Sequence, residues 1–382
     1  MRICLVYDHL FPQTIGGAER WMRDLALRLA ESGHEVTYLT MRHWSTHAPP
    51  SLPGVRLFGL TAPGRIYDQE RRTLGPPLRF GFAVGRHLFR HRGDYDVVHI
   101  ASFPYFPLLA AGALRRRGRY RLFVDWHEVW SLAYWRRYAG SVVGTIGWLV
   151  QRRCLRLPQR AFCFSQMNAA RLVAEGHLAA PTVLGLYDGP TEPTSGAHVD
   201  PALVVYAGRH VPEKRVGALV RAFARAKKRR PELRLEIYGD GPQRSYVEGL
   251  VRQFGLTESV RVAGQRPEEE IEAALARAAC LATASEREGF GRVVVEAAAR
   301  GTPSVVVAGP ENAATELVRD GVNGAIAADA SPEPLAEALL RVIDAGGALR
   351  ASTARWFAEK AAALSLEGSL ELVVRSYTEA SG

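Results

Sequence analysis

The chain has 382 residues, 47% of them hydrophobic and 23% charged, with a formal net charge of +10 at pH 7. This length exceeds what one hydrophobic core usually supports, so we expect two domains, and the composition excludes a disordered protein. The positive charge favours an anionic partner, which leaves a nucleoside diphosphate, an anionic membrane surface and nucleic acid open.

The sequence shows no signal for export or membrane insertion. The four cysteines lack C-x-x-C spacing, so we interpret them as reduced core thiols. Met1 leads directly into a predicted strand without the apolar region of a signal peptide. The best candidate for a membrane span, residues 139–150, is much shorter than the about 20 residues needed to cross a bilayer. We therefore expect a cytoplasmic protein, with peripheral docking at the inner face of the membrane left open.

The first half begins with a strand, helix and strand. Residues 2–7 and 35–40 predict the strands, and the helix between them opens at the adjacent glycines Gly16 and Gly17. One face of this helix is apolar and consists of Met22, Leu25, Ala26 and Leu29. The glycines lack the G-x-G-x-x-G spacing of a dinucleotide-binding oxidoreductase, which argues against that alternative.

Apolar runs at 97–100, 121–125 and 160–164 continue the alternation of strands and helices. Asp125-Trp126-His127-Glu128 follows one of them, at the carboxyl edge of the predicted sheet, where open α/β sheets bind ligands. Asp94-Tyr95-Asp96 has the D-x-D spacing of a metal site. It directly precedes a strand and has no cluster of His, Cys or carboxylate ligands around it, so we expect no bound metal.

The segment 132–157 interleaves aromatic and aliphatic residues with five arginines. Its most conspicuous members are Trp135, Tyr138, Ile146, Trp148 and Leu149. This composition suits a helix lying on anionic lipid, and it also suits a buried helix whose arginines extend to solvent. The basic clusters at 115–121 and 227–230 are typical of helix C-termini, where cations complement the helix dipole.

The second half repeats the plan of the first. A stretch rich in turn formers, 189–196, predicts the linker, and strands are expected at 203–207 and 234–238 with a helix between them. That helix has an apolar face of Leu219, Ala222, Phe223 and Ala226, and further apolar runs follow at 260–263, 279–284 and 304–308. Strand 203–207 ends in a glycine loop that carries Arg209 and Lys214, two cations able to meet one compact anion.

The stretch 285–297 places Glu288 and Glu296 eight positions apart, where a strand gives way to a helix. Gly289 and Gly291 flank Phe290 and leave backbone N–H groups open to an anion at the helix N-terminus. Glu296, one turn into the helix, has two acceptor oxygens that suit a vicinal diol such as that of ribose, whereas Glu288 lies in the loop, where it could face a sugar. The stretch therefore predicts a nucleotide-sugar site.

Continued through Arg300-Gly301-Thr302-Pro303 and 316–324, this block resembles the E-x7-E region of retaining glycosyltransferase family 4. The resemblance implies a GT-B fold, with two Rossmann-like domains facing each other across a cleft and a C-terminal helix that crosses back. It assigns 1–190 and about 365–382 to an acceptor-side domain. Residues 200–364 form the nucleotide-sugar-binding domain.

The resemblance also implies the reaction, which is metal-independent transfer of a sugar from a nucleotide-diphosphate-sugar co-substrate to an acceptor hydroxyl, with no cofactor. It implies catalytic roles for His127, Arg209, Lys214 and Glu288. The implied donor-binding residues are Gly16, Gly17, Arg209, Lys214, Arg266, Glu288, Gly289, Phe290, Gly291 and Glu296. Glu128 departs from the family, which more often has Asp at this position.

The sequence leaves the nucleotide base, the sugar and the acceptor open. The acceptor is a lipid-linked glycan or cell-surface polysaccharide precursor in one interpretation and a soluble natural product in another. A basic nucleic-acid-binding protein is the more distant alternative, and it would leave the block 285–324 unexplained.

Overall fold

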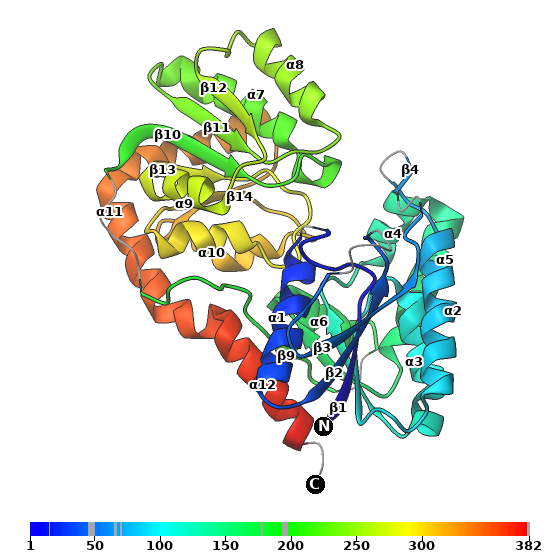
Figure 1. Cartoon of the computed structure of the whole chain (residues 1–382). Coiled ribbons are helices and arrows are strands. Elements are labelled where there is room, and N and C mark those ends of the chain that lie inside the picture. The colour runs from blue at the N-terminus through cyan, green and yellow to red at the C-terminus, as the bar shows by residue number, and fades with distance from the viewer. Residues whose placement is uncertain are drawn as a thin grey trace. The chain divides into compact units, whose positions relative to one another are not determined.

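The computed structural model in Figure 1 describes residues 1–14, 16–44, 50–64, 67–68, 71–176, 179–192 and 198–379. The chain forms two compact units. Unit 1 comprises Met1–Leu186 and Glu367–Gly382, and unit 2 comprises Tyr187–Leu366. Residues 193–196 of the predicted linker lie outside the described residues.

The described part of unit 1 contains a parallel sheet with the strand order β3-β2-β1-β6-β7-β8-β9. The order reverses between β1 and β6, the position at which doubly wound sheets bind ligands. The strands are β1 (Arg2–Val6), β2 (Glu35–Met41), β3 (Val55–Thr61), β6 (Val97–Ala101), β7 (Arg121–Trp126), β8 (Arg160–Cys163) and β9 (Thr182–Val183), and a separate hairpin pairs β4 (Tyr67–Asp68) with β5 (Arg71–Arg72).

Helices cover both faces of this sheet, and α2 to α5 lie together on one of them (Figure 1). The helices are α1 (Gly17–Glu31), α2 (Gly75–Arg90), α3 (Tyr105–Gly118), α4 (Leu132–Ala139), α5 (Ser141–Leu155), α6 (Gln166–Ala174) and α12 (Leu366–Glu379). The predicted apolar face of α1 is fully buried. The segment 132–157 forms two helices, with Trp135 turned inward and Ile146 and Leu149 exposed.

The C-terminal helix α12 belongs to unit 1, as the predicted crossover requires. The Tyr377 hydroxyl bonds His99 Nδ1 in the buried interior, and Glu367 forms an ion pair with Arg28 of α1. Burial raises the pKa of Tyr377 well above its usual value. This hydroxyl is therefore a neutral hydrogen-bonding group that ties the end of the chain to the sheet.

Unit 2 repeats the architecture with the parallel strand order β12-β11-β10-β13-β14-β15, which reverses between β10 and β13. Its strands are β10 (Asp200–Ala207), β11 (Arg234–Tyr238), β12 (Val260–Gly264), β13 (Ala278–Ala282), β14 (Ser304–Val307) and β15 (Gly324–Ala327). Its helices are α7 (Val216–Arg229), α8 (Arg244–Gln253), α9 (Glu268–Arg277), α10 (Arg292–Ala299) and α11 (Pro332–Leu364), with short 3-10 helices η1 (Pro212–Lys214) and η2 (Ala313–Leu317).

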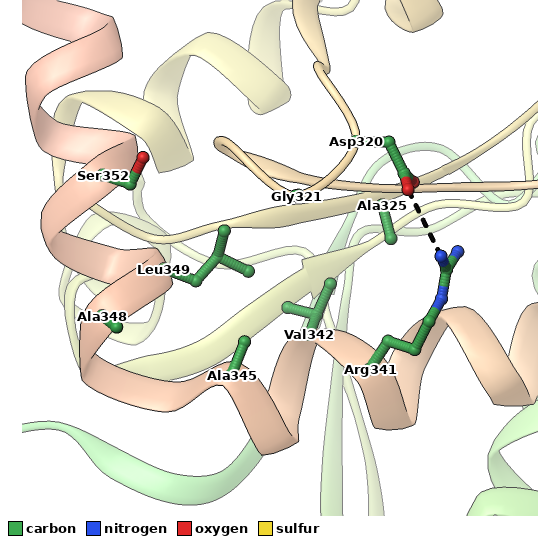
Figure 2. Close-up of a pocket in the computed structure, with 10 residues that line it drawn as sticks. Asp320, Gly321, Ala325, Arg341, Val342, Ala345, Ala348, Leu349 and Ser352 are labelled. Carbon is green, nitrogen blue, oxygen red and sulfur yellow. Dashed lines mark hydrogen bonds and ion pairs between the residues drawn. The ribbon is translucent and has the colours of Figure 1, made fainter.

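A hollow of about 420 Å³ lies between the edge strand β15 and α11 (Figure 2). Its wall is mostly apolar, including Val342 and Leu349, and Asp320 pairs with Arg341 at 3.2 Å on its border. Helix α11 changes direction near the hollow, because Gly346 has φ 51° and ψ −136°. None of the residues predicted for the donor or the acceptor lines this hollow.

None of the helices in the described ranges combines the length and the hydropathy required to traverse a bilayer. All four cysteines are buried and free, which agrees with their interpretation as core thiols.

Candidate active site

Two loops of unit 2 follow the neighbouring strands β10 and β13 and meet where the strand order reverses. Glu286 N donates to Glu213 O at 2.8 Å, which joins the loops through their backbones. Three ion pairs cross between the same loops: Lys214–Glu288, Arg215–Glu286 and Arg287–Glu213. The fold thus brings together two motifs that lie about seventy positions apart in the sequence.

Glu288 and Lys214 contact each other directly. The Lys214 ammonium donates to Glu288 Oε1, which also accepts from Ser285 Oγ at 2.8 Å. Both charged side chains remain partly exposed. Because an ammonium carries three donors, Lys214 can keep Glu288 and still bind an anion.

Arg209 lies in the same loop and is exposed. Within the described residues its guanidinium makes no hydrogen bond or ion pair. The backbone beneath it is fixed, since Tyr206 Oη donates to Arg209 O at 3.1 Å and His210 N donates to Asp240 O at 2.8 Å. Gly239 permits this packing, because it has φ 110° and an added Cβ would lie 2.0 Å from Gly208 O. The loop therefore presents a free cation on a fixed backbone.

Helix α10 begins directly after the glycine-flanked Phe290. Gly291 is its N-cap with φ 99°, and an added Cβ would lie 2.8 Å from the Cβ of Ala314. The Phe290 side chain is buried, so its backbone is the part best placed to contact a ligand. The first N–H groups of a helix have no intrahelical acceptor, and they favour an anion at this end.

Glu296 lies one turn into α10 and is held by an arginine that the sequence analysis did not single out. Arg292 Nε donates to Glu296 Oε1 at 2.7 Å, and Arg292 Nη2 reaches both carboxylate oxygens of Asp188 at 2.6 and 2.7 Å. Burial lowers the pKa of Arg292, but the two carboxylates outweigh it and the net pKa is raised. The i,i+4 spacing of Arg292 and Glu296 could have indicated this pair, whereas nothing in the sequence indicated Asp188.

In unit 1, His127 follows β7 and is held by aromatic stacking. Its ring lies parallel to Phe164, with 4.6 Å between the centroids. The loop is anchored by Asn168, whose Nδ2 donates to His127 O at 3.3 Å. The Nε2 atom of His127 is buried without a hydrogen-bond partner among the described residues. Burial lowers the pKa of His127, and Asp125 and Glu19 only partly oppose this.

Asp125 links the His127 loop to helix α1. Trp21 of α1 donates from Nε1 to Asp125 Oδ2 at 2.6 Å, and His99 Nε2 lies 2.8 Å from Asp125 Oδ1. The Trp21 ring also meets Phe164 edge to face at 5.4 Å. The helix that opens at Gly16 and Gly17 and the loop that carries His127 are therefore parts of one packed assembly within unit 1.

Comparison with known proteins identifies the chain. The model described as Glycosyl transferases group 1 matches residues 191–361, and the model described as Glycosyltransferase Family 4 matches 15–183. The chain belongs to glycosyltransferase family 4. It is accordingly a glycosyltransferase of a retaining family, as the E-x7-E block predicted.

The chain of this family 4 glycosyltransferase covers most of some relatives and only a small part of others. The chain is 27% identical to glycogen synthase of Mycobacterium tuberculosis over 93% of its own length and 89% of that protein. It is 33% identical to exopolysaccharide phosphotransferase SCO2592 of Streptomyces coelicolor, but over 46% of this chain and only 18% of that protein.

Solved structures confirm the GT-B fold of this family 4 member. Sucrose-phosphate synthase from Thermosynechococcus elongatus superposes with a TM-score of 0.82 at 21% identity, over 99% of this chain and 98% of that chain. Anabaena HepE in complex with UDP-glucose gives a TM-score of 0.74 at 19% identity, over 99% of this chain and the whole of that chain.

Two further sequence predictions have clear positions in this glycosyltransferase. Arg266 follows the edge strand β12, and its Nε lies 3.8 Å from Glu270 Oε1, outside the contacts that join the two loops. Asp96 pairs with Arg2 at 2.9 Å. Asp94 pairs with His91 at 3.0 Å. In the described ranges, no group of three or more His, Cys, Asp or Glu residues is arranged to hold a metal ion.

The lowered pKa of His127 predicts how stability depends on pH. The unfolded chain binds a proton at this residue below about pH 6.5, whereas the folded glycosyltransferase resists protonation. The stability that His127 contributes is therefore present above about pH 6.5 and is lost as the pH falls below it. Urea unfolding at pH 7.5 and 5.5 should show a smaller pH-dependent loss for His127→Gln than for the wild type. The exposed His91→Gln serves as the control, and equal losses in all three proteins would contradict the prediction.

Proposed function

We propose that this enzyme transfers a sugar from a nucleoside-diphosphate sugar, bound by unit 2, to an acceptor hydroxyl with retention of configuration. The observation that carries the proposal is the meeting of the β10 and β13 loops, which combines Arg209, Lys214 and Glu288 beside the start of α10. This arrangement has the cations that a diphosphate requires and a carboxylate for the sugar.

The proposed roles follow from where charge develops. When the bond between sugar and diphosphate breaks, negative charge gathers on the departing diphosphate. Arg209, Lys214 and the N-terminus of α10 would stabilise that charge more strongly in the transition state than in the ground state. Glu296, oriented by Arg292, would accept hydrogen bonds from the ribose hydroxyls. Glu288 would bind the sugar, and the acceptor would attack from the face that the leaving group occupies, without a covalent nucleophile.

The acceptor is proposed to bind unit 1 near His127. Burial lowers the pKa of this residue, so the imidazole is neutral at pH 7 and can donate one hydrogen bond and accept another. Because HepE is solved with UDP-glucose, a UDP-sugar is the first donor to test. A lipid-linked glycan or polysaccharide precursor, reached from the cytoplasm, is the acceptor class that we favour.

A ligand panel tests the donor assignment. Thermal unfolding is measured with UDP, GDP, dTDP, ADP and NAD at equal concentrations. A ligand at one hundred times its Kd adds about 2.7 kcal/mol to the free energy of unfolding, so the cognate diphosphate should raise the Tm. We expect one nucleoside diphosphate to exceed the others and NAD to have no effect. A Tm raised by NAD alone, or by none of the five, would contradict the proposal.

A further inference from the structure

The positive charge of this enzyme is concentrated in one part of unit 1. Residues 74–160 contain 15 arginines, no lysine and only four acidic residues. None of those acidic residues lies in helices α2, α3, α4 or α5, which contain no Asp or Glu. The helices α2, α3 and α5 each lead into a strand of one parallel sheet, so they run in the same direction. Their C-terminal arginines gather at one edge, among them Arg90, Arg116, Arg117 and Arg153.

Exposed apolar side chains lie on the same helices. Of 13 large hydrophobic side chains exposed among the described residues, eight belong to α2, its N-cap or α5. Phe82 is 76% exposed and Val142 is 72% exposed. The remaining six are Leu74, Leu78, Phe89, Val143, Ile146 and Leu149.

The spacing of these residues gives each helix one outward apolar stripe. In α2 the exposed positions 78, 82 and 89 lie opposite the buried Phe80, Val84 and Leu88. In α5 the positions 142, 146 and 149 share one face. Both helices pack against α3 and cover the same face of the sheet (Figure 1). We call the outward side of α2, α3 and α5 the α2–α5 face.

We propose that the α2–α5 face docks onto the anionic leaflet of a lipid bilayer. Apolar side chains on such a surface enter the boundary between headgroups and acyl chains, while guanidinium groups bind lipid phosphates in a bidentate manner. Cations at helix C-termini also complement the helix dipole, but that effect gives no reason for the exposed apolar side chains. The three helices of this face contain no Asp or Glu, and apart from Arg152, which pairs with Glu175, their basic residues make the face complementary to a negative surface.

Nucleic acid matches only part of this surface. It would pair with the arginines, but it would leave Phe82, Val142 and Ile146 exposed without a partner. The lipid surface accounts for both the charge and the apolar stripes. It goes beyond the proposed function by placing the acceptor-binding unit at a membrane, where a lipid-linked acceptor would be reached.

Sedimentation of the full-length protein with vesicles tests the inference. Vesicles of phosphatidylcholine alone are compared with vesicles that also contain phosphatidylglycerol, at low and at high salt. We expect the protein to sediment with the anionic vesicles at low salt, to be released at high salt and to remain soluble with neutral vesicles. Two double variants should each weaken partitioning onto anionic vesicles by about tenfold. One combines Phe82→Ser with Ile146→Ser, and the other combines Arg116→Gln with Arg153→Gln.

Matched controls come from unit 2. Tyr246→Ser with Phe254→Ser removes two other exposed aromatic side chains, and Lys228→Gln with Arg229→Gln removes cations from a helix C-terminus. Both should sediment like the wild type. The inference would be overturned by equal recovery in the supernatant with both vesicle types, or by an equal loss of vesicle binding in the control variants. Tighter binding to duplex DNA than to anionic vesicles would also overturn it. Nucleotide binding is measured in the same preparation without lipid. A protein that binds its nucleotide but does not sediment with vesicles would contradict only the docking proposal, whereas loss of nucleotide binding would contradict the donor proposal.

Discussion

Arg209→Ala is expected to lower kcat/KM for sugar transfer by about two to three orders of magnitude. The guanidinium is the exposed cation of the β10 loop without a partner among the described residues, so it is available to the departing diphosphate. Removing one donor that stabilises developing negative charge costs roughly 3 kcal/mol in the transition state. Initial rates with the cognate nucleotide sugar give this ratio, and thermal unfolding shows whether the variant remains folded.

A matched arginine separates this effect from a general loss of charge. Arg252 lies in the last turn of α8 and is also exposed, so Arg252→Ala removes the same group from the same unit. It should retain wild-type kcat/KM within about twofold. A decrease in Arg209→Ala no larger than that in Arg252→Ala would remove Arg209 from the diphosphate site.

The repeated units of strand, helix and strand were predictable because buried parallel strands are continuous apolar runs. The predicted strands at 97–100, 121–125 and 234–238 differ from β6, β7 and β11 by no more than one residue at either end. The edge strands β3, β9 and β15 were not predicted. In β3 exposure alternates over the first four residues and none of the seven is fully buried, so its sequence lacks the apolar run on which the prediction depended.

The motifs of the candidate site were predictable, but their contacts were not. Both loops were expected at carboxyl ends of strands, and the strand order then determines that they meet. The pairing of side chains between the two loops depends on rotamers and interatomic distances, and neither can be deduced from spacing in the sequence. The pairs Lys214–Glu288 and Arg292–Asp188 therefore emerged only from the structure.

Glu296→Ala is expected to act on nucleotide binding and Glu288→Ala on sugar transfer, because the two carboxylates have different ion-pair partners. Glu296→Ala should weaken the affinity for the cognate nucleoside diphosphate by at least about tenfold, because a hydrogen bond to a charged group contributes roughly 1.5–3 kcal/mol. Arg292 keeps its ion pair with Asp188, so α10 retains its anchor. Isothermal titration measures the affinity, and an unchanged Kd would remove the ribose assignment.

Glu288→Ala should leave the Kd for the same diphosphate unchanged or slightly lower, while kcat falls by at least about a hundredfold. The carboxylate that pairs with Lys214 is gone, so the ammonium is freed for the diphosphate, whereas the transferred sugar loses its contact. Glu286→Ala is the control, because it breaks the neighbouring pair with Arg215 between the same two loops and leaves the Glu288 carboxylate in place. A kcat that falls equally in both variants would mean that Glu288 acts only by holding the loops together, whereas a loss confined to Glu288→Ala places its carboxylate against the sugar.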